Sequence, residues 1–216
     1  MLWTPADGAG KPRPLTESKN GQFPWSFSPD GKRIAFANFP AGGSGDIWTV
    51  PVEVDGAGLK AGKPEVYLQT PANELYPAFS PDGRWIAYRS NESGTEEVYV
   101  RAFPDKGGKW LISTNGGMMA VWSRNGPELF YRTADQHIMV VAYTVKGDAF
   151  VADKPRVWTE RRLADAYFQN LDIALDGKRF VALMPAVVPD EQRALNHVIF
   201  LQNFADEVRR RRVGKP

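Results

Sequence analysis

The sequence predicts an all-β fold built from repeated four-stranded antiparallel sheets, and three observations support this prediction. First, one phrase recurs roughly every 40 to 50 residues, a period found in several repeat folds. Its four copies are FSPDGKRIAF (27–36), FSPDGRWIAY (79–88), WSRNGPELFY (122–131) and IALDGKRFVA (173–182). Second, each copy contains a tight-turn sequence. Third, β-branched and aromatic residues follow every turn, which is typical of strands.

The turn Ser-Pro-Asp-Gly meets a separate steric demand with each of its residues. Proline presets φ at the first central position of a type I turn, aspartate accepts the second, and glycine takes the left-handed position of a G1 bulge. The third and fourth copies drop the proline but keep the other two positions. We therefore predict a structural role in turns for four residue pairs: Asp30 and Gly31, Asp82 and Gly83, Asn125 and Gly126, and Asp176 and Gly177.

Each repeat holds enough strands for one sheet. The run directly after each turn is apolar almost without alternation, as in a strand buried on both faces. A third strand is predicted at 46–52, 97–103, 137–145 and 197–204, and an outer strand at 64–70, 109–114 and 155–160. Each unit therefore reads inner strand, turn, second strand, loop, third strand, turn and outer strand, which is the four-stranded blade of a β-propeller.

The repeats divide the chain into blades and a tail. We predict a β-propeller over 1–204, with blades at about 19–70, 71–117, 118–160 and 161–204 and a partial blade over 1–18. Residues 2–5 and 11–18 resemble a third and an outer strand, so they either close the ring onto the last blade or complete a blade whose beginning is missing. We favour the second alternative, in which the chain is part of a larger propeller such as a six-bladed one. A short C-terminal helix and a basic tail are predicted over 205–216, where acidic residues precede arginines.

Charge and composition exclude several classes of function. The net charge is +2, but basic residues cluster at 209–212 and 215, so the rest of the chain is slightly acidic. The body therefore gives no electrostatic case for binding nucleic acid, and the basic tail is interpreted as a solvated terminus. The absence of cysteine excludes disulfides and thiolate metal sites. No apolar run approaches the ~18 residues that a membrane span needs.

The Ser-Pro-Asp-Gly phrase, with its basic residue and its apolar run ending in Ala-Tyr or Ala-Phe, resembles the TolB-like, WD-related propeller repeat. Residues 80–117 and the final segment 195–212 are similar to the C-terminal propellers of bacterial transmembrane serine/threonine kinases. The resemblance implies a binding or sensing module for a protein or a small ligand. The kinase motifs are absent from this chain, so the phosphotransfer chemistry of that family is not carried over.

Two compartments follow from these alternatives. MLWTPADGAG at the N-terminus lacks the charged region and apolar core of a signal peptide. The chain as written is therefore predicted to stay in the cytoplasm. If it is the sensor part of a larger membrane protein, the resemblance implies an extracytoplasmic location.

Catalytic motifs are incomplete in this sequence. Residues 56–64 (GAGLKAGKP) lack the glycine spacing and the Ser or Thr of a P-loop, and residues 42–46 (GGSGD) lack one glycine of a nucleophile elbow. We therefore predict a non-enzymatic protein without catalytic residues or cofactor. The alternative is the propeller portion of a hydrolase, either a prolyl-oligopeptidase-like peptidase or a metal-dependent lactonase-like enzyme, whose catalytic part is absent. A third possibility is an incomplete propeller that self-associates through open blade edges.

A metal site is not predicted either. His137 and His197 stand far apart in the sequence without a pattern of carboxylates nearby, and the repeated aspartates already have a role in turns. Glu96 and Glu97 are adjacent on a predicted strand, so they face opposite ways and are interpreted as solvated charges. A channel metal needs several inward carboxylates, and the predicted inner strands offer mainly Asp172.

A ligand is expected at the mouth of the central channel and on the face formed by two sets of loops. The outer-to-inner loops are 18–23, 70–76, 115–118 and 161–168, and the second-to-third loops are 39–45, 91–96 and 134–136. This placement follows from analogy with other propellers. The side chains expected there are Asn73, Glu74, Tyr76, Asn91, Glu92, Asn115, Met118 and Tyr167. Tyr76, Met118 and Tyr167 are the natural anchors for a protein partner.

Overall fold

The computed structural model covers residues 1–216 and is described for all of them except 8–9, 57, 167–169, 175–178 and 186–216. The described residues form antiparallel sheets, and no helix that could cross a membrane is found among them. The all-β prediction is confirmed. The helix predicted within 205–216 and the third strand predicted at 197–204 lie outside the described residues.

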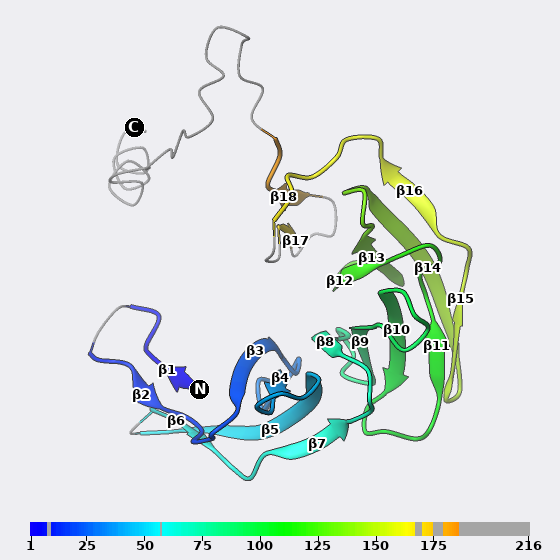
Figure 1. Ribbon diagram of the computed structural model, residues 1–216. Coiled ribbons are helices and arrows are strands. Elements are labelled where there is room, and N and C mark those ends of the chain that lie inside the picture. The colour runs from blue at the N-terminus through cyan, green and yellow to red at the C-terminus, as the bar shows by residue number, and fades with distance from the viewer. Residues whose placement is uncertain (8–9, 57, 167–169, 175–178, 186–216) are drawn as a thin grey trace, which may run out of the picture. The chain divides into compact units, whose positions relative to one another are not determined.

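The sheets have the strand order that the repeat predicts: first, second, third and outer strand, each antiparallel to its neighbour (Figure 1). The first sheet contains β3 (Gly21–Phe27), β4 (Arg33–Phe39), β5 (Asp46–Asp55) and β7 (Glu65–Leu68). The second contains β8 (Glu74–Phe79), β9 (Trp85–Ser90), β10 (Glu97–Ala102) and β11 (Lys109–Leu111). The third contains β12 (Met118–Trp122), β13 (Glu128–Arg132), β14 (Ile138–Lys146) and β16 (Arg156–Thr159). The described part of the fourth contains β17 (Leu171–Ile173) and β18 (Phe180–Ala182).

Two hairpin arms extend the first and third sheets beyond the predicted strands. β5 continues past its predicted end and doubles back into β6 (Gly58–Ala61), and β14 doubles back into β15 (Ala149–Ala152). In each arm the third strand runs past the end of its pairing with the second strand. The chain then turns tightly, and the following short strand pairs antiparallel with this extension. Neither arm was predicted from the sequence.

The sheets stack in chain order through apolar faces. The second sheet packs Ala87 and Val98 against Trp122 and Tyr131 of the third. Ala35 of the first sheet packs with second-sheet side chains in the same way, and the third sheet packs on the fourth through another apolar cluster. The first strands of consecutive sheets are also neighbours, β3 with β8, β8 with β12, and β12 with β17. Each large side chain buried in these faces stabilises the fold by about 1.5–3 kcal/mol.

Residues near the N-terminus pack on the first sheet. β1 (Leu2–Trp3) pairs only with β2 (Arg13–Pro14) among the described strands, and the side chains of Met1 and Leu15 pack on the cluster around Phe36. The terminal ammonium of Met1 donates to the carbonyl of Thr16 at 3.0 Å. A sheet-like pair of strands over 1–18 is therefore present. Whether it completes a blade or closes a ring stays a prediction.

The turns of the first two repeats have the predicted geometry. Gly31 and Gly83 both have φ of 70°, and both donate their N–H to the carbonyl of the serine three residues earlier. Asp30 accepts from Ser28 Oγ at 2.6 Å and from Lys32 N at 3.0 Å, and the bond from Ser28 lowers the pKa of the Asp30 carboxyl. In the second repeat the Asp82 carboxylate accepts the equivalent bonds.

The prediction for the third turn is wrong in one respect. Gly126 does not have a left-handed φ, and Glu128 N donates to the Gly126 carbonyl instead. The third turn, Arg124-Asn125-Gly126-Pro127, has no proline at the first central position. Its proline instead follows the glycine and fixes φ at 127, so the backbone of this turn adopts a different conformation. Asn125 keeps a serine contact, since its N–H lies 3.4 Å from Ser123 Oγ. Asp176 and Gly177 lie outside the described residues.

Candidate functional site

A β-bulge interrupts the first strand of each of the three larger sheets. The register with the second strand shifts at Trp25 in β3, at Tyr76–Pro77 in β8 and at Met119–Ala120 in β12. Tyr76 and Met119 have left-handed φ values of 57° and 55°, a conformation that costs a residue with a side chain about 1–2 kcal/mol. Bulges re-aim side chains, and strain of this kind gathers at functional sites. The bulge recurs at the same level of all three sheets.

A cavity of about 650 Å³ lies between the first strands at this level. Its volume falls within the roughly 300–1,000 Å³ of small-molecule sites. Aromatic and thioether side chains line much of it, among them Trp25, Tyr76, Met119 and Trp122. Its described charged lining consists of Arg124 and Asp172. The cavity runs from the bulges toward the Ser-Pro-Asp-Gly turns, away from the loops where a ligand was expected.

The walls of the cavity are held by contacts between neighbouring sheets. The ring of Trp25 meets the ring of Tyr76 edge to face, with centroids 4.5 Å apart. Trp122 Nε1 donates to the carbonyl of Ala78 at 2.9 Å. Phe79 N donates to Ser26 Oγ at 3.0 Å. These bonds join the first strands of three sheets, so the aromatic wall is preformed.

At the other end of the first strands, hydrogen bonds tie the predicted binding loops to one another. Gly45 N donates to Asn73 Oδ1 at 2.9 Å, and Asn73 N donates to Asn91 Oδ1 at 2.8 Å. Ser44 Oγ donates to the carbonyl of Pro71 at 3.0 Å. Loops from the first and second sheets therefore form one connected surface. Asn73 and Asn91 lie in this surface, where they were predicted, and both hold its backbone.

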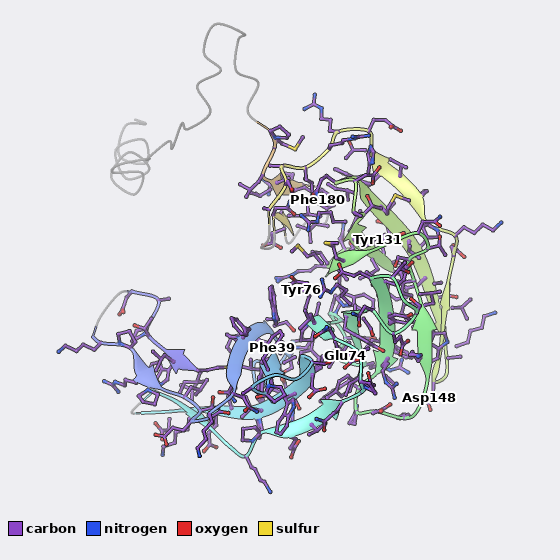
Figure 2. All side chains as sticks on the ribbon, in the orientation of Figure 1. Phe39, Glu74, Tyr76, Tyr131, Asp148 and Phe180 are labelled. Carbon is purple, nitrogen blue, oxygen red and sulfur yellow. The ribbon has the colours of Figure 1, made fainter. Side chains whose placement is uncertain are left out.

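Glu74, which is labelled in Figure 2, belongs to β8 next to these loops. Its side chain is buried, and the residue is only 1% exposed. Its Oε1 accepts from Thr70 Oγ1 at 2.5 Å, while its Oε2 has no hydrogen-bond partner among the residues that the structure describes. Burial raises the pKa of the Glu74 carboxyl, and the nearby carboxylate of Asp46 raises it further. Burial raises the pKa of Asp46 as well. Glu74 was expected on the loop face, and the structure gives it a position that supports the loops from below.

Glu97 is buried, which corrects its interpretation as a solvated charge. Its carboxylate accepts hydrogen bonds from the Ser113 hydroxyl and, at 3.0 Å, from Gly116 N. Ser113 Oγ in turn accepts from Val98 N at 2.7 Å. This network fixes the loop that carries Asn115, whose φ is 68° and whose side chain is exposed. Strand alternation does turn Glu96 the other way, since it pairs with Arg89 at 2.7 Å.

The remaining predicted residues are Glu92, Met118 and Tyr167. Glu92 is exposed and pairs with Lys109 at 2.5 Å. Met118 is half-buried, and its Sδ lies 2.8 Å from Nη2 of Arg132. Tyr167 lies outside the described residues. Of the described predicted residues, only Tyr76 lines the cavity.

Trp25, Met119 and Arg132 were not predicted as site residues from the sequence. No motif marks a bulge in the sequence, so the signal available was the alignment of the repeats, which places Tyr76 and Met119 at equivalent positions.

Metal ligands do not gather in the described part of the chain, where no group of three or more His, Cys, Asp or Glu side chains could hold an ion. His137 forms a 2.9 Å contact with Asp135 at the start of β14, and its half-buried ring has the surface position expected for it. His197 lies outside the described residues. Asp172 is the one carboxylate among the described residues of the cavity wall.

Stacked four-stranded sheets, with their first strands around a shared cavity, define a β-propeller. Three solved structures with this fold are similar to the chain. They are the protein assigned as TolB from Agrobacterium tumefaciens (TM-score 0.52, 20% identity), TolB from Acinetobacter baumannii (0.51, 17%) and the protein assigned as a 6-phosphogluconolactonase from Bacteroides uniformis (0.50, 20%). The aligned regions cover 70%, 81% and 76% of this chain, respectively.

These similarities show a TolB-like β-propeller fold. The aligned parts make up 55%, 40% and 48% of the three structures, so the chain spans about half of their length. No protein-family model matches the sequence, and no curated protein does.

Proposed function

We propose that the chain is a non-catalytic binding module that takes up a protein segment or a small ligand in the cavity between its first strands. The observation that carries this proposal is the repeated bulge. At the same level of three sheets it directs large side chains toward one cavity, and Tyr76 and Met119 adopt a strained backbone there. Strain that recurs at one level is explained by a shared role better than by packing alone.

The cavity wall supports a ligand with apolar or aromatic parts. Trp25 and Tyr76, which are both half-buried, offer large faces at low entropic cost, because each ring has only two side-chain torsions. Contacts between the sheets already fix these rings, so a ligand would not have to order them. A preformed wall of this kind suits binding.

We infer further that the module acts as a sensor, in the way that its resemblance to receptor-kinase propellers implies. The loop surface tied by Asn73 and Asn91 would be the second contact area for a protein partner, with Asn115 and Met118 at its edge. Glu74 and Glu92 would support it. The lactonase-like neighbour shares the fold alone, and its chemistry is not part of this proposal.

A displayed peptide library, selected without bias on the full chain, tests this function. The key variant is Tyr76→Asn, because asparagine tolerates left-handed φ and the substitution therefore removes the ring without adding strain. We expect the selected peptides to bind Tyr76→Asn at least tenfold more weakly, which corresponds to about 1.4 kcal/mol. The matched control is Val54→Ser, at a residue that is 81% exposed on the hairpin arm of the first sheet.

Circular dichroism of both variants ensures that the fold is intact. Peptides that bind Tyr76→Asn as tightly as the wild-type chain would contradict the assignment of the cavity. If none of the selected peptides compete with one another for a common site on the chain, the binding role itself would be contradicted.

A further inference from the structure

Two arginines occupy the same position of the repeat, directly after the second-strand tyrosine. Arg89 follows Tyr88 in β9 and Arg132 follows Tyr131 in β13, whereas the first sheet has Ala37 at this position. Both arginines lie where the second strand ends at the loop surface, not at the turn end of the cavity. The Arg89 guanidinium lies 5.1 Å from the centroid of the Tyr76 ring.

The two guanidinium groups differ in how their charge is balanced. Arg89 pairs with Glu96 at 2.7 Å. Arg132 is 4% exposed and has no ion-pair partner among the described residues. Its Nη1 donates to Gln136 Oε1 and to the carbonyl of Ala166, both at 3.0 Å, and its Nη2 donates to Met118 Sδ. Its Nε has no hydrogen-bond partner in the part of the chain that the structure describes.

This arrangement leaves a buried positive charge with neutral acceptors. Removing the partner of a buried charge usually costs several kcal/mol, because the remaining charge is neither solvated nor paired. Burial lowers the pKa of the Arg132 guanidinium, while the more distant carboxylates of Asp165 and Glu96 act in the opposite direction. A thioether is a weak hydrogen-bond acceptor, and a methionine side chain is easily rearranged. The Met118 contact is therefore the one that a better acceptor would replace.

We propose that Arg132 is the anchor of a carboxylate-binding site on the loop surface, where an acidic side chain of a protein partner displaces the Met118 thioether. A guanidinium presents two parallel N–H groups that match the two oxygens of a carboxylate. Nε and Nη2 of Arg132 are the pair available for this geometry, because Nη1 is already used. Asp165 and Glu96 are close enough to favour a group with one negative charge over one with two.

This site is separate from the cavity and does not depend on it. Met118 was expected to be an apolar anchor for a partner, and here it acts as the cover of the site. Arg101 provides an internal control. Within the described segments its Nε also has no hydrogen-bond partner, but its Nη2 pairs with Asp105 at 2.7 Å.

NMR of the arginine Nε–Hε groups in the full chain tests the proposal with sodium acetate as the probe. The Arg132 resonance is assigned by its loss in Arg132→Lys. At constant ionic strength, set with sodium chloride, acetate should shift it along a saturating curve with a dissociation constant on the order of 10 mM, and the Arg101 resonance should not move. An Arg132 resonance that moves no more than that of Arg101 would overturn the proposal. A response to inorganic phosphate but not to acetate would overturn the carboxylate assignment.

A second pair of variants does not depend on access of acetate to the site or on folding of Arg132→Lys. Met118→Glu places a carboxylate where the thioether lies, and Met118→Gln is its neutral counterpart of the same shape. We expect Met118→Glu to melt about 3 °C or more above Met118→Gln and to lose the acetate response. If Met118→Glu melts at or below Met118→Gln, Arg132 does not accept a carboxylate at this position and the proposal fails.

Discussion

Alanine at the turn glycines provides a sharp test of the repeat, because the chain contains its own control. Gly31 and Gly83 have φ of 70° in equivalent turns, whereas Gly126 stands at the same place in the repeat without a left-handed φ. A Cβ added at Gly31 or Gly126 would meet no atom within 4 Å, so steric contact does not differ between them. The backbone conformation alone separates the two sites.

The expected magnitudes follow from that difference. Alanine in the left-handed region costs about 1–2 kcal/mol, and the loss of unfolded-state freedom offsets about 0.4–1 kcal/mol of this. Gly31→Ala should therefore lose about 1 kcal/mol of stability. Gly83→Ala should lose about the same, because its Cβ would stand 3.4 Å from Pro29 Cδ, which is an ordinary van der Waals contact. Gly126→Ala carries only the favourable effect and should gain up to about 1 kcal/mol.

Calorimetry of the three variants measures these changes. For a chain of this size, 1 kcal/mol corresponds to about 2–4 °C in Tm. Gly31→Ala and Gly83→Ala should melt below the wild-type chain, and Gly126→Ala should melt at or above it. Equal losses at all three positions would refute the assignment of the third turn. No loss at Gly83 would refute the bulge geometry of the first two.

Three further predictions follow from the buried polar groups and the cavity. The raised pKa of Glu74 means that the folded state binds the proton more tightly than the unfolded chain does. The contribution of Glu74 to the free energy of unfolding is therefore full below its unfolded pKa, and it is lost as pH rises through the folded pKa. Glu74→Gln should therefore be more stable than wild type at pH 8. In urea titrations its stability should fall less than that of wild type as pH rises above the usual pKa of a glutamate, and an unchanged slope would count against this. Ser113→Ala leaves Glu97 and the Val98 N–H without their partner and should lower the free energy of unfolding by about 1–3 kcal/mol. The control Ser93→Ala, at an exposed serine, should change it by no more than about 0.5 kcal/mol. Similar urea midpoints for the two variants would argue against the buried network. Calcium at millimolar concentration should leave Tm unchanged, because Asp172 is the one carboxylate in the described cavity wall, and a rise in Tm would favour the lactonase-like alternative.

Sequence reasoning was sufficient for features that depend on local sterics. The turns at Asp30–Gly31 and Asp82–Gly83 follow from φ preferences of single residues, and the strand order follows from their spacing. Gly126 shows the limit of this reasoning, because a neighbouring proline redirected the same glycine. Features that depend on contacts between sheets could not be predicted from the local sequence either.

The candidate site depends mostly on such contacts. The bulge at Tyr76 arises where β8 packs between two neighbouring sheets, and no local pattern announces it. Glu97 is charged and was expected in solvent, but a serine from the following strand end and a loop amide solvate it in the interior. The unbalanced charge of Arg132 becomes visible only when its partners from three segments are known. The alignment of the repeats still indicates the level of the bulges, because the register shifts at equivalent positions in β8 and β12.

Binding in the cavity between the first strands is tested most directly by NMR mapping of a peptide selected on the full chain. Residues 25–29, 76–81, 119–122 and 124 line the cavity. Apart from the prolines, which have no amide proton, their backbone amides should show the largest shifts on addition of the peptide. Shifts confined to the outer strands β7, β11 and β16 would place the ligand elsewhere and contradict a binding role for the cavity.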